Sequence, residues 1–212
     1  MTDQMTSRLA LPLVQAAQAQ KHVTVNESLA RLDGLVNLVL ASVNRGTPPA
    51  TVNDGTCFAV PPGATDAWAG QDGRIAIASN GGWTFAEAHA GMQAFVTDAG
   101  VNAIFDGEIW VEGALTLGGF GSALVARTAE LEVVLTAGAS FTTDLYIPNS
   151  AMVIGATARV TEAMTGTLTS WRMGTTGALD RFGSGLGIQQ GSWARGMLSQ
   201  PFTYWDPTPI IL

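Results

Sequence analysis

The spacing of apolar residues changes along the chain and divides it into three segments. The first pattern is a seam in which apolar residues recur every three or four positions, formed by Val25, Leu29, Leu32, Val36, Val39 and Val43. This spacing places their side chains on one face of a helix. Thr24 and Glu27 have the spacing of a capping box, and Gly46 followed by Pro48 opposes continuation. The pattern therefore predicts one helix over roughly residues 25–44.

Short apolar runs alternate with turn-forming pairs between residues 46 and 113. Asp72-Gly73 precedes one such run, and Asp106-Gly107 has the composition of a two-residue hairpin turn of type I′. The segment is therefore expected to form a small antiparallel β domain of about five or six strands. Its large apolar side chains are Trp68, Trp83 and Trp110, which in so small a unit belong in the core more often than on a binding surface.

Longer strands are expected from residue 114 onward. In Leu131–Thr136, the residues Leu131, Val133 and Leu135 alternate onto one face. Strand-like runs then recur about every ten residues without a helical segment, which favours a β-sandwich of jelly-roll type. The predicted fold class is thus mainly β, with an N-terminal attachment segment and helix (1–45), a small antiparallel β domain (46–113) and a jelly-roll-like C-terminal β-sandwich (114–212).

The predicted helix leaves two arrangements open. Two to three heptads are too few for a stable coiled coil on their own, and Gly34 costs the helix about 1 kcal/mol relative to Ala. The helix therefore either packs on its own β domain or joins identical helices in an oligomer. Residues 1–24 are rich in Ala and Gln. They suit docking against a neighbouring protein, either as an extended segment or as a short helix.

Composition and charge narrow the classes of partner. Charged residues make up only 13% of the chain and there are 25 Gly, which suits a β protein with many turns and extensive subunit contacts. The net charge is -7 and no basic run occurs, so we expect no nucleic-acid partner. No apolar run approaches the ~20 residues of a membrane span, so we expect no membrane insertion. Cys57 is the only cysteine; it cannot form an internal disulfide and is expected to be a small buried residue.

Catalytic signatures are missing from the sequence. The two histidines, His22 and His89, offer little material for a metal site or for a nucleophile with its base. Glu130 and Glu132 would share one strand face and could approach each other as a glycosidase pair does. Two acids on the outer face of a strand are, however, usually only solvated. We therefore expect no enzyme activity, no cofactor and no metal.

Carbohydrate binding is better supported by the composition of the second half. Sugar recognition uses exposed aromatic rings against the apolar faces of the sugar, with planar polar groups fixing the hydroxyls. The candidate ligand-binding residues of these types are Trp171, Arg172, Asp180, Arg181, Trp193, Arg195, Tyr204 and Trp205. The alternative is that Trp171 and Trp205 are core anchors and that Asp180 and Arg181 form a structural ion pair.

One motif near the N-terminus resembles a known family. The run from Gln18 to Thr24, Gln-Ala-Gln-Lys-His-Val-Thr, is followed by Asn26-Glu27 and Leu32-Asp33. This arrangement is similar to the opening motif of a domain family of unknown function that occurs in prophage virion proteins and in the head spike proteins of gene transfer agents. Trp68-Ala-Gly70 and Phe105-Asp-Gly107 extend the resemblance, as does the stretch from Asp180 to Gly187.

The resemblance implies a spike or fibre component on the surface of a phage-like particle that is made in the bacterial cytoplasm. Such a component would bind host cell-surface or capsular polysaccharide. Its partners would be other particle proteins, at a capsid vertex or tail, and copies of itself in a trimer or pentamer. The alternatives are a purely structural head or tail decoration protein and a capsule depolymerase. The residues expected to mediate assembly are Gln18, Gln20, Lys21, His22, Asn26, Leu29, Leu32, Val36 and Val39.

Overall fold

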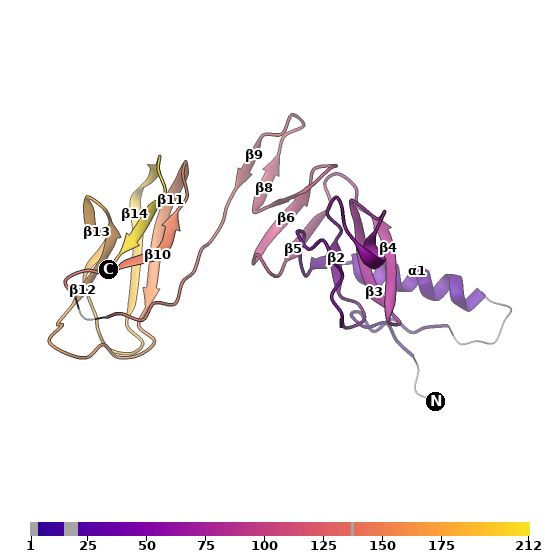
Figure 1. Ribbon diagram of the computed structural model, residues 1–212, viewed down its shortest axis with the longest axis horizontal. Helices are drawn as coiled ribbons and strands as arrows, with labels where there is room; N and C mark the ends of the chain where they lie inside the picture. The colour runs from indigo at the N-terminus through magenta and orange to yellow at the C-terminus, as the bar shows by residue number, and fades with distance from the viewer. Residues whose placement is uncertain (1–3, 15–20, 137) are drawn as a thin grey trace. The chain divides into compact units, whose positions relative to one another are not determined.

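The computed structural model describes residues 4–14, 21–136 and 138–212, which form mainly β-strands. The mainly β fold class expected from the sequence is thereby confirmed. The chain divides into two compact units, unit 1 (Met1–Arg127) and unit 2 (Thr128–Leu212), both seen in Figure 1. The three expected segments become two units because strand β1 (Val39–Leu40), from the N-terminal segment, runs inside the sheet of the small β domain. Within the described residues, no helix has the length and apolar character needed to cross a membrane.

Unit 1 is built on a seven-stranded sheet in the order β4-β3-β2-β1-β5-β6-β7. Besides β1, its strands are β2 (Cys57–Ala59), β3 (Arg74–Ser79), β4 (Gly82–Glu87), β5 (Gln93–Val96), β6 (Val101–Phe105) and β7 (Trp110–Glu112). β1 runs parallel to both of its neighbours, β2 and β5. The sheet is therefore mixed and not purely antiparallel, because residues expected at the end of the helix instead supply its central strand.

Helix α1 spans Lys21–Leu35, so it begins and ends earlier than the seam predicts. Thr24 lies inside the helix, and its backbone oxygen accepts a hydrogen bond from the Ser28 hydroxyl, so the expected capping box is wrong. Val36 and Val39 lie beyond the helix. The expectation of one continuous helical seam is therefore also wrong.

The end of α1 is held by the side chain of Arg8. Its guanidinium donates hydrogen bonds to the backbone oxygens of Asp33 (2.9 Å), Gly34 (2.7 Å) and Asn37 (2.9 Å). Carbonyls in the last turn of a helix have no partner within the helix and need one elsewhere. Asn37 then takes a positive φ of 47°, and the chain turns into β1.

The sheet of unit 1 buries side chains on both faces. Alternation along β2 sends Cys57 and Ala59 to one face and Phe58 to the other. α1 packs against the first face through Gly34, where an added Cβ would lie 2.7 Å from Cδ1 of Ile77. That face holds the larger core cluster, which consists of Leu38, Leu40, Val43, Cys57, Ala59, Ile75, Ile77, Ala94, Val96 and Ala103.

Aromatic residues fill the second face. Trp68, from the short 3-10 helix η1 (Asp66–Trp68), is fully buried. Its ring centroid lies 5.3 Å from that of Phe58 and 5.1 Å from that of Trp83, in tilted and edge-to-face arrangements. The expectation that Trp68 belongs to the core is confirmed, and the half-buried Trp83 packs against the same cluster.

Two turns of this sheet differ in length. Asn80 and Gly81, both with positive φ, form the two-residue turn between β3 and β4, where Ser79 pairs with Gly82. Four residues, 106–109, instead connect β6 to β7. The Asp106 carboxylate accepts hydrogen bonds from the backbone N–H groups of Glu108 and Ile109, each at 2.8 Å. The two-residue turn expected at Asp106-Gly107 is therefore wrong, because this carboxylate organises a longer loop.

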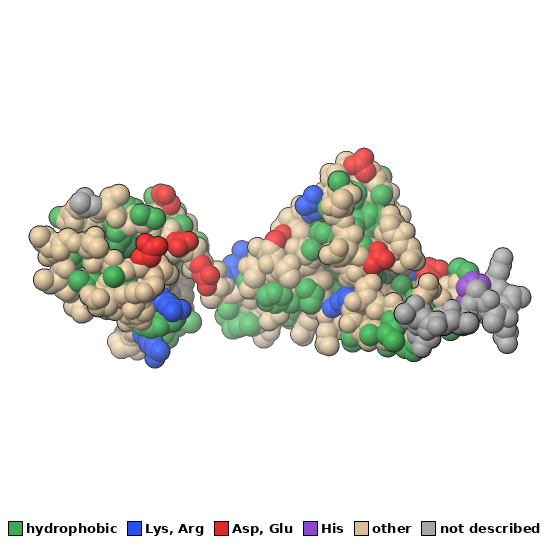
Figure 2. Space-filling model, turned by 90° about the horizontal axis from the view of Figure 1, so that it is seen from below, with side chains coloured by type: hydrophobic (Ala, Val, Ile, Leu, Met, Phe, Trp, Pro, Cys, Tyr) green, Lys and Arg blue, Asp and Glu red, His purple; other side chains and the backbone are tan. Residues whose placement is uncertain are grey.

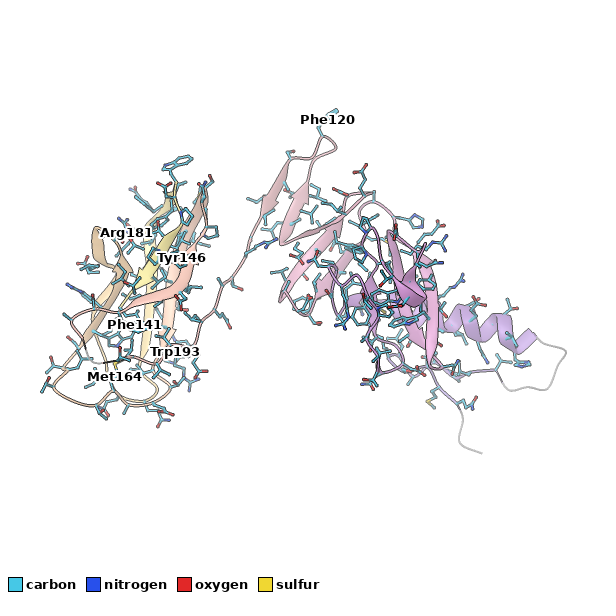
Figure 3. All side chains as sticks on the ribbon, viewed as in Figure 1. Phe120, Phe141, Tyr146, Met164, Arg181 and Trp193 are labelled. Atoms are coloured by element: carbon cyan, nitrogen blue, oxygen red, sulfur yellow. The ribbon has the colours of Figure 1, made fainter. Side chains whose placement is uncertain are left out.

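A hairpin of β8 (Ala114–Leu117) and β9 (Ala123–Val125) follows the sheet. Phe120 lies at its tip, fully exposed, and Figure 3 shows the ring projecting into solvent. Residues 128–136, which come next, belong to no strand. The strand expected over Leu131–Thr136 is thus wrong for the single chain.

Unit 2 is a small β-sandwich of six strands. They are β10 (Thr142–Ile147), β11 (Ala151–Arg159), β12 (Trp171–Thr175), β13 (Ala178–Leu186), β14 (Trp193–Tyr204) and β15 (Thr208–Ile211). One sheet has the order β10-β15-β12-β13, and the other pairs β11 with β14. Both sheets contribute to one core, which consists of Ile147, Met173, Phe182, Ala194, Tyr204 and Ile210. At Gly196 the sheets approach so closely that an added Cβ would overlap the backbone oxygen of Phe182.

Candidate functional site

The polar residues of the N-terminal motif hold residues 4–14 against α1. Asp33 is only 2% exposed, and its carboxylate accepts hydrogen bonds from the Thr6 hydroxyl (2.8 Å) and from the backbone N–H groups of Arg8 (3.0 Å) and Leu9 (2.6 Å). A buried carboxylate needs such donors to offset its loss of hydration. The motif therefore has a structural role within the chain.

Asn26 makes a second attachment of the same kind. Its side-chain oxygen accepts a hydrogen bond from the backbone N–H of Val14 at 2.8 Å, and its amide nitrogen donates to the backbone oxygen of Val14 at 3.0 Å. The amide thus pairs with the N-terminal segment much as a neighbouring strand would. Asn26 was expected to mediate assembly. Both polar groups of its side chain form hydrogen bonds within unit 1.

The other residues expected to mediate assembly are divided by the structure. Gln18 and Gln20 lie outside the described residues, Lys21 begins α1, and His22 and Leu29 are half-buried. Leu32 is 49% exposed, and Val36 and Val39 are each 37% exposed. Val25, which precedes them in the seam, is exposed as well. These apolar side chains are therefore left largely uncovered, while α1 binds the N-terminal segment through Asp33 and packs on its own sheet at Gly34.

The expected ligand-binding residues also fall into two groups. Tyr204 is buried in the core of unit 2, and Trp171 is half-buried with its indole N–H donating to the backbone oxygen of Gly187 at 2.9 Å. Arg181 is half-buried, with its guanidinium carbon 4.1 Å from the ring centroid of Phe202. Within the described residues no ion pair joins Asp180 to Arg181. The exposed members of the set are Arg172, Asp180, Trp193, Arg195 and Trp205.

Trp193 lies on the outer face of the β11–β14 sheet. Arg159 pairs with Trp193 across the two strands, and residues directly opposite each other share a face. The guanidinium carbon of Arg159 lies 5.4 Å from the centroid of the Trp193 ring. This outer face, which we call the β11–β14 face, comprises Met152, Ile154, Arg159, Trp193, Arg195 and Met197, all of them exposed.

The β11–β14 face is open, apolar and basic. Its four apolar side chains are 57% to 69% exposed, and neither Arg159 nor Arg195 makes an ion pair within the described residues. Figure 3 labels Trp193 on this sheet, and Figure 2 shows basic side chains of unit 2 lying next to hydrophobic ones. A planar aromatic ring can stack on the apolar face of a ligand ring. Guanidinium groups beside it can donate hydrogen bonds to hydroxyl or carboxylate oxygens of the same ligand.

Trp205 cannot share one small ligand with Trp193. Trp193 begins β14 and pairs with Arg159, whereas Tyr204, next to Trp205, ends β14 and pairs with Ala151, eight positions away along β11, which corresponds to roughly 26 Å. Trp171 is nearer to Trp193, because its indole bonds to Gly187 in the loop that leads into β14. The structure therefore brings together Trp193 and Arg195 on one strand, packs Trp171 against the core of unit 2, and separates Trp205.

Several residues of this face were not anticipated from the sequence. Arg159, Met152, Ile154 and Met197 were absent from the expected set. Alternation along residues 151–159 is a signal that could have found them, but the outward face could be recognised only after pairing with β14 was known. The pairing joins positions more than thirty residues apart, such as Arg159 and Trp193.

The described residues contain few features of a catalytic or metal-binding site. No group of three or more potential metal-ligating side chains occurs there. Glu130 and Glu132 are exposed on the segment that forms no strand. Burial raises the pKa of the Cys57 thiol from its usual 9.0 to about 11, with the Asp33 carboxylate acting in the same direction and Arg8 opposing it. A thiol with this pKa stays protonated at neutral pH and is a poor nucleophile.

The fold and these contacts define a mainly β chain in which a helix-and-sheet unit precedes a separate β-sandwich. Residues 25–111 match the family described as protein of unknown function, DUF2793. The match begins within α1 and ends within β7, so it covers most of the helix and nearly all of the seven-stranded sheet of unit 1. The resemblance to a family of unknown function is confirmed for these residues. No curated protein matches the chain.

Proposed function

We propose that this protein is a surface component of a phage-like particle, and that its β11–β14 face binds polysaccharide of the host cell surface. The observation that carries the binding part is the open Trp193 ring with Arg159 beside it. The link to a particle comes from the resemblance of the N-terminal motif. The proposal describes a binding protein and involves no catalysis.

The chemistry of the face favours a sugar over other small ligands. An indole that is 57% exposed can stack on the C–H face of a pyranose, and burying it releases water from apolar surface on both partners. Arg159 and Arg195 supply ten N–H donors for hydroxyl or carboxylate oxygens. The face has no acidic side chain, so a polysaccharide that carries uronic acids or other acidic groups suits it best.

Unit 1 supplies the attachment in this proposal. Val25 and Leu32 on α1, and Val36 and Val39 beyond its end, are apolar side chains left exposed on the single chain. Apolar surface of this kind is typical of protein–protein interfaces. We assign it to contacts with other particle proteins and with further copies of the chain in a closed homo-oligomer, a trimer or a pentamer.

A structural decoration protein without a ligand is the second candidate. It is favoured by Met152, Ile154 and Met197, because three exposed apolar side chains beside Trp193 equally suit a protein partner. The two candidates differ in what the face contacts. Sugar binding requires Trp193 to be accessible in the assembled particle, whereas a decoration role would cover it.

The deciding experiment compares capsulated bacterial cells with capsule-stripped cells of the same strain. The purified chain should sediment with the capsulated cells only, and purified capsule should compete. Release of reducing ends from the capsule is measured in parallel. Equal sedimentation with both cell types would contradict polysaccharide binding, and reducing-end release would instead indicate a depolymerase.

A further inference from the structure

The second face of the sheet of unit 1 is only partly covered. Trp68 and its aromatic neighbours pack over β2, β3 and β4. Phe95 of β5 lies on this same face, because its neighbours Ala94 and Val96 belong to the core cluster on the opposite one. The Phe95 side chain is 42% exposed, so the part of the face over β1, β5 and β6 stays open within unit 1.

The open part of the face holds a concave site around Phe95. Val39 of β1 pairs with Phe95 on one side, and Asn102 of β6 pairs with it on the other. Directly paired residues share a face, so these three side chains form one row across the strands. Asn37 and Gln93 line the cavity next to this row, which has a volume of about 270 Å³. We call these five residues the Phe95 site.

Three amide side chains thus surround one aromatic ring. Asn37, Gln93 and Asn102 are all exposed, and unlike the amide of Asn26 none of their amides bonds to another group within the described residues. Each amide offers two N–H donors and one acceptor oxygen. The residues that line the cavity include no charged side chain. The chemistry of the site therefore suits an uncharged ligand that carries both hydroxyl groups and apolar surface.

The backbone of the site is fixed by contacts that leave the Asn37 amide free. Asn37 has a φ of 47°, a left-handed conformation that Asn adopts more readily than most residues. Its backbone oxygen accepts a hydrogen bond from Arg8 at 2.9 Å. The next residue, Leu38, accepts one from the backbone N–H of Phe95 at 3.0 Å. A rim that is already ordered lowers the entropic cost of binding a ligand.

We propose that the Phe95 site binds one unit of an uncharged saccharide. The phenyl ring and Val39 contact the C–H face of the sugar, and the three amides exchange hydrogen bonds with its hydroxyls. The cavity is slightly smaller than the ~300–1,000 Å³ of sites for drug-sized ligands, which suits one or two sugar rings. It opens on a sheet face, so a sugar inside a longer chain can enter it. This second site differs from the β11–β14 face in its ligand, because that face offers guanidinium groups to acidic sugars.

Nuclear magnetic resonance of the full-length chain tests the site directly, because side-chain amides give their own signals in a proton–nitrogen correlation spectrum. The chain is titrated into the millimolar range with uncharged oligosaccharides of glucose, galactose, mannose or N-acetylglucosamine. At least one of these should shift the amide signals of Asn37, Gln93 and Asn102 in a saturable manner.

Substitutions in and outside the site identify the contact. Phe95→Ala removes the stacking surface and should weaken binding about tenfold. Gln93→Ala removes one amide from an exposed side chain and should also weaken binding, without touching the core. Phe120→Ala removes a fully exposed ring outside the site and is the matched control, which should bind as wild type. Circular dichroism checks the fold of each variant.

Three results would overturn the proposal. The first is the absence of a saturable shift at these amides with every oligosaccharide of the panel. The second is an unchanged affinity in folded Phe95→Ala and Gln93→Ala. The third is an equal response to oligogalacturonate, because that ligand is charged. The readouts do not depend on the β11–β14 face, so a failed capsule pull-down would leave them unchanged.

Discussion

The Thr6 hydroxyl donates a hydrogen bond of 2.8 Å to the carboxylate of Asp33, which joins the N-terminal segment to the last turn of α1. The two residues are 27 positions apart, and the carboxylate is almost completely buried. Around this bond, the backbone N–H groups of Arg8 and Leu9 complete the set of donors. The motif that carries the family resemblance is thus explained in part by the packing of a single chain.

Removing this carboxylate should destabilise unit 1. Asp33→Ala leaves the donors of Thr6, Arg8 and Leu9 without an acceptor, and we expect a loss of about 2–4 kcal/mol in the free energy of unfolding. Urea unfolding followed by circular dichroism measures it. Glu27→Ala is the matched control, because Glu27 is half-exposed and only pairs with Arg31, which should cost less than about 0.5 kcal/mol. Similar losses of unfolding free energy in the two variants would show that the hydrogen bonds of Asp33 stabilise unit 1 no more than an exposed ion pair does.

Gly34→Ala should destabilise the protein although Ala favours helices. The new methyl group would meet the Ile77 side chain at 2.7 Å, and such overpacking costs about 1–3 kcal/mol, which outweighs a helix gain of about 1 kcal/mol. The double variant with Ile77→Val removes the methyl group in conflict and should recover part of the loss. A stabilised Gly34→Ala single variant would mean that α1 does not pack on β3 at this point.

Leu32→Asp should reduce the mass of the oligomer in solution. Leu32 is 49% exposed in the single chain, so the charge disturbs little within unit 1 but opposes burial against another chain. Light scattering measures the mass, and circular dichroism checks the fold. Val23→Asp makes a similar change on the opposite side of α1 and should keep the wild-type mass. If Leu32→Asp also keeps it, the helix is not an interface between copies.

Trp193→Ala should weaken polysaccharide binding about tenfold, or ~1.4 kcal/mol, with little change in melting temperature. The indole is 57% exposed, so its removal deletes few contacts within unit 2. Interferometry with immobilised capsule measures the affinity. Trp205→Ala, at the other end of β14, is the control and should bind as wild type. A large fall in the melting temperature of Trp193→Ala would place the indole in the packing of the sandwich instead.

Cys57 should react with iodoacetamide slowly in the native protein and rapidly in urea. Burial raises its pKa to about 11, so below that pH the native thiol carries little of the reactive thiolate. Because the folded-state pKa lies above the usual 9.0, the neutral thiol favours the fold below pH 9, and this contribution is lost as the pH rises towards 11. Mass spectrometry of labelled protein at pH 8 checks the rates. Equal labelling with and without urea would contradict the burial of Cys57.

The helix shows where local patterns stop being informative. Spacings of three and four residues continue through Val36 and Val39, yet α1 ends at Leu35. The end depends on Arg8, which caps the last carbonyls from an earlier segment, and on β1, whose partners lie in β2 and β5. Neither contact is visible in the spacing of the seam.

The candidate site was predictable only in part for a related reason. The residue types around Trp193 and Arg195 predict a sugar-binding surface, which stays a prediction; Tyr204 of the same set is core, and Arg159 was not anticipated. Which side of a strand faces solvent depends on its register with the partner strand, and β14 contains an irregularity in its pairing with β11 that shifts this register.

The sequence by itself determined the mainly β class, the burial of Trp68 and the position of many turns, because alternation and turn-forming residues act over a few positions. The tertiary structure alone decided the end of α1, the parallel placement of β1, and the separation of Trp193 from Trp205. These features depend on hydrogen bonds and side-chain contacts between segments far apart in the chain, which no local pattern encodes.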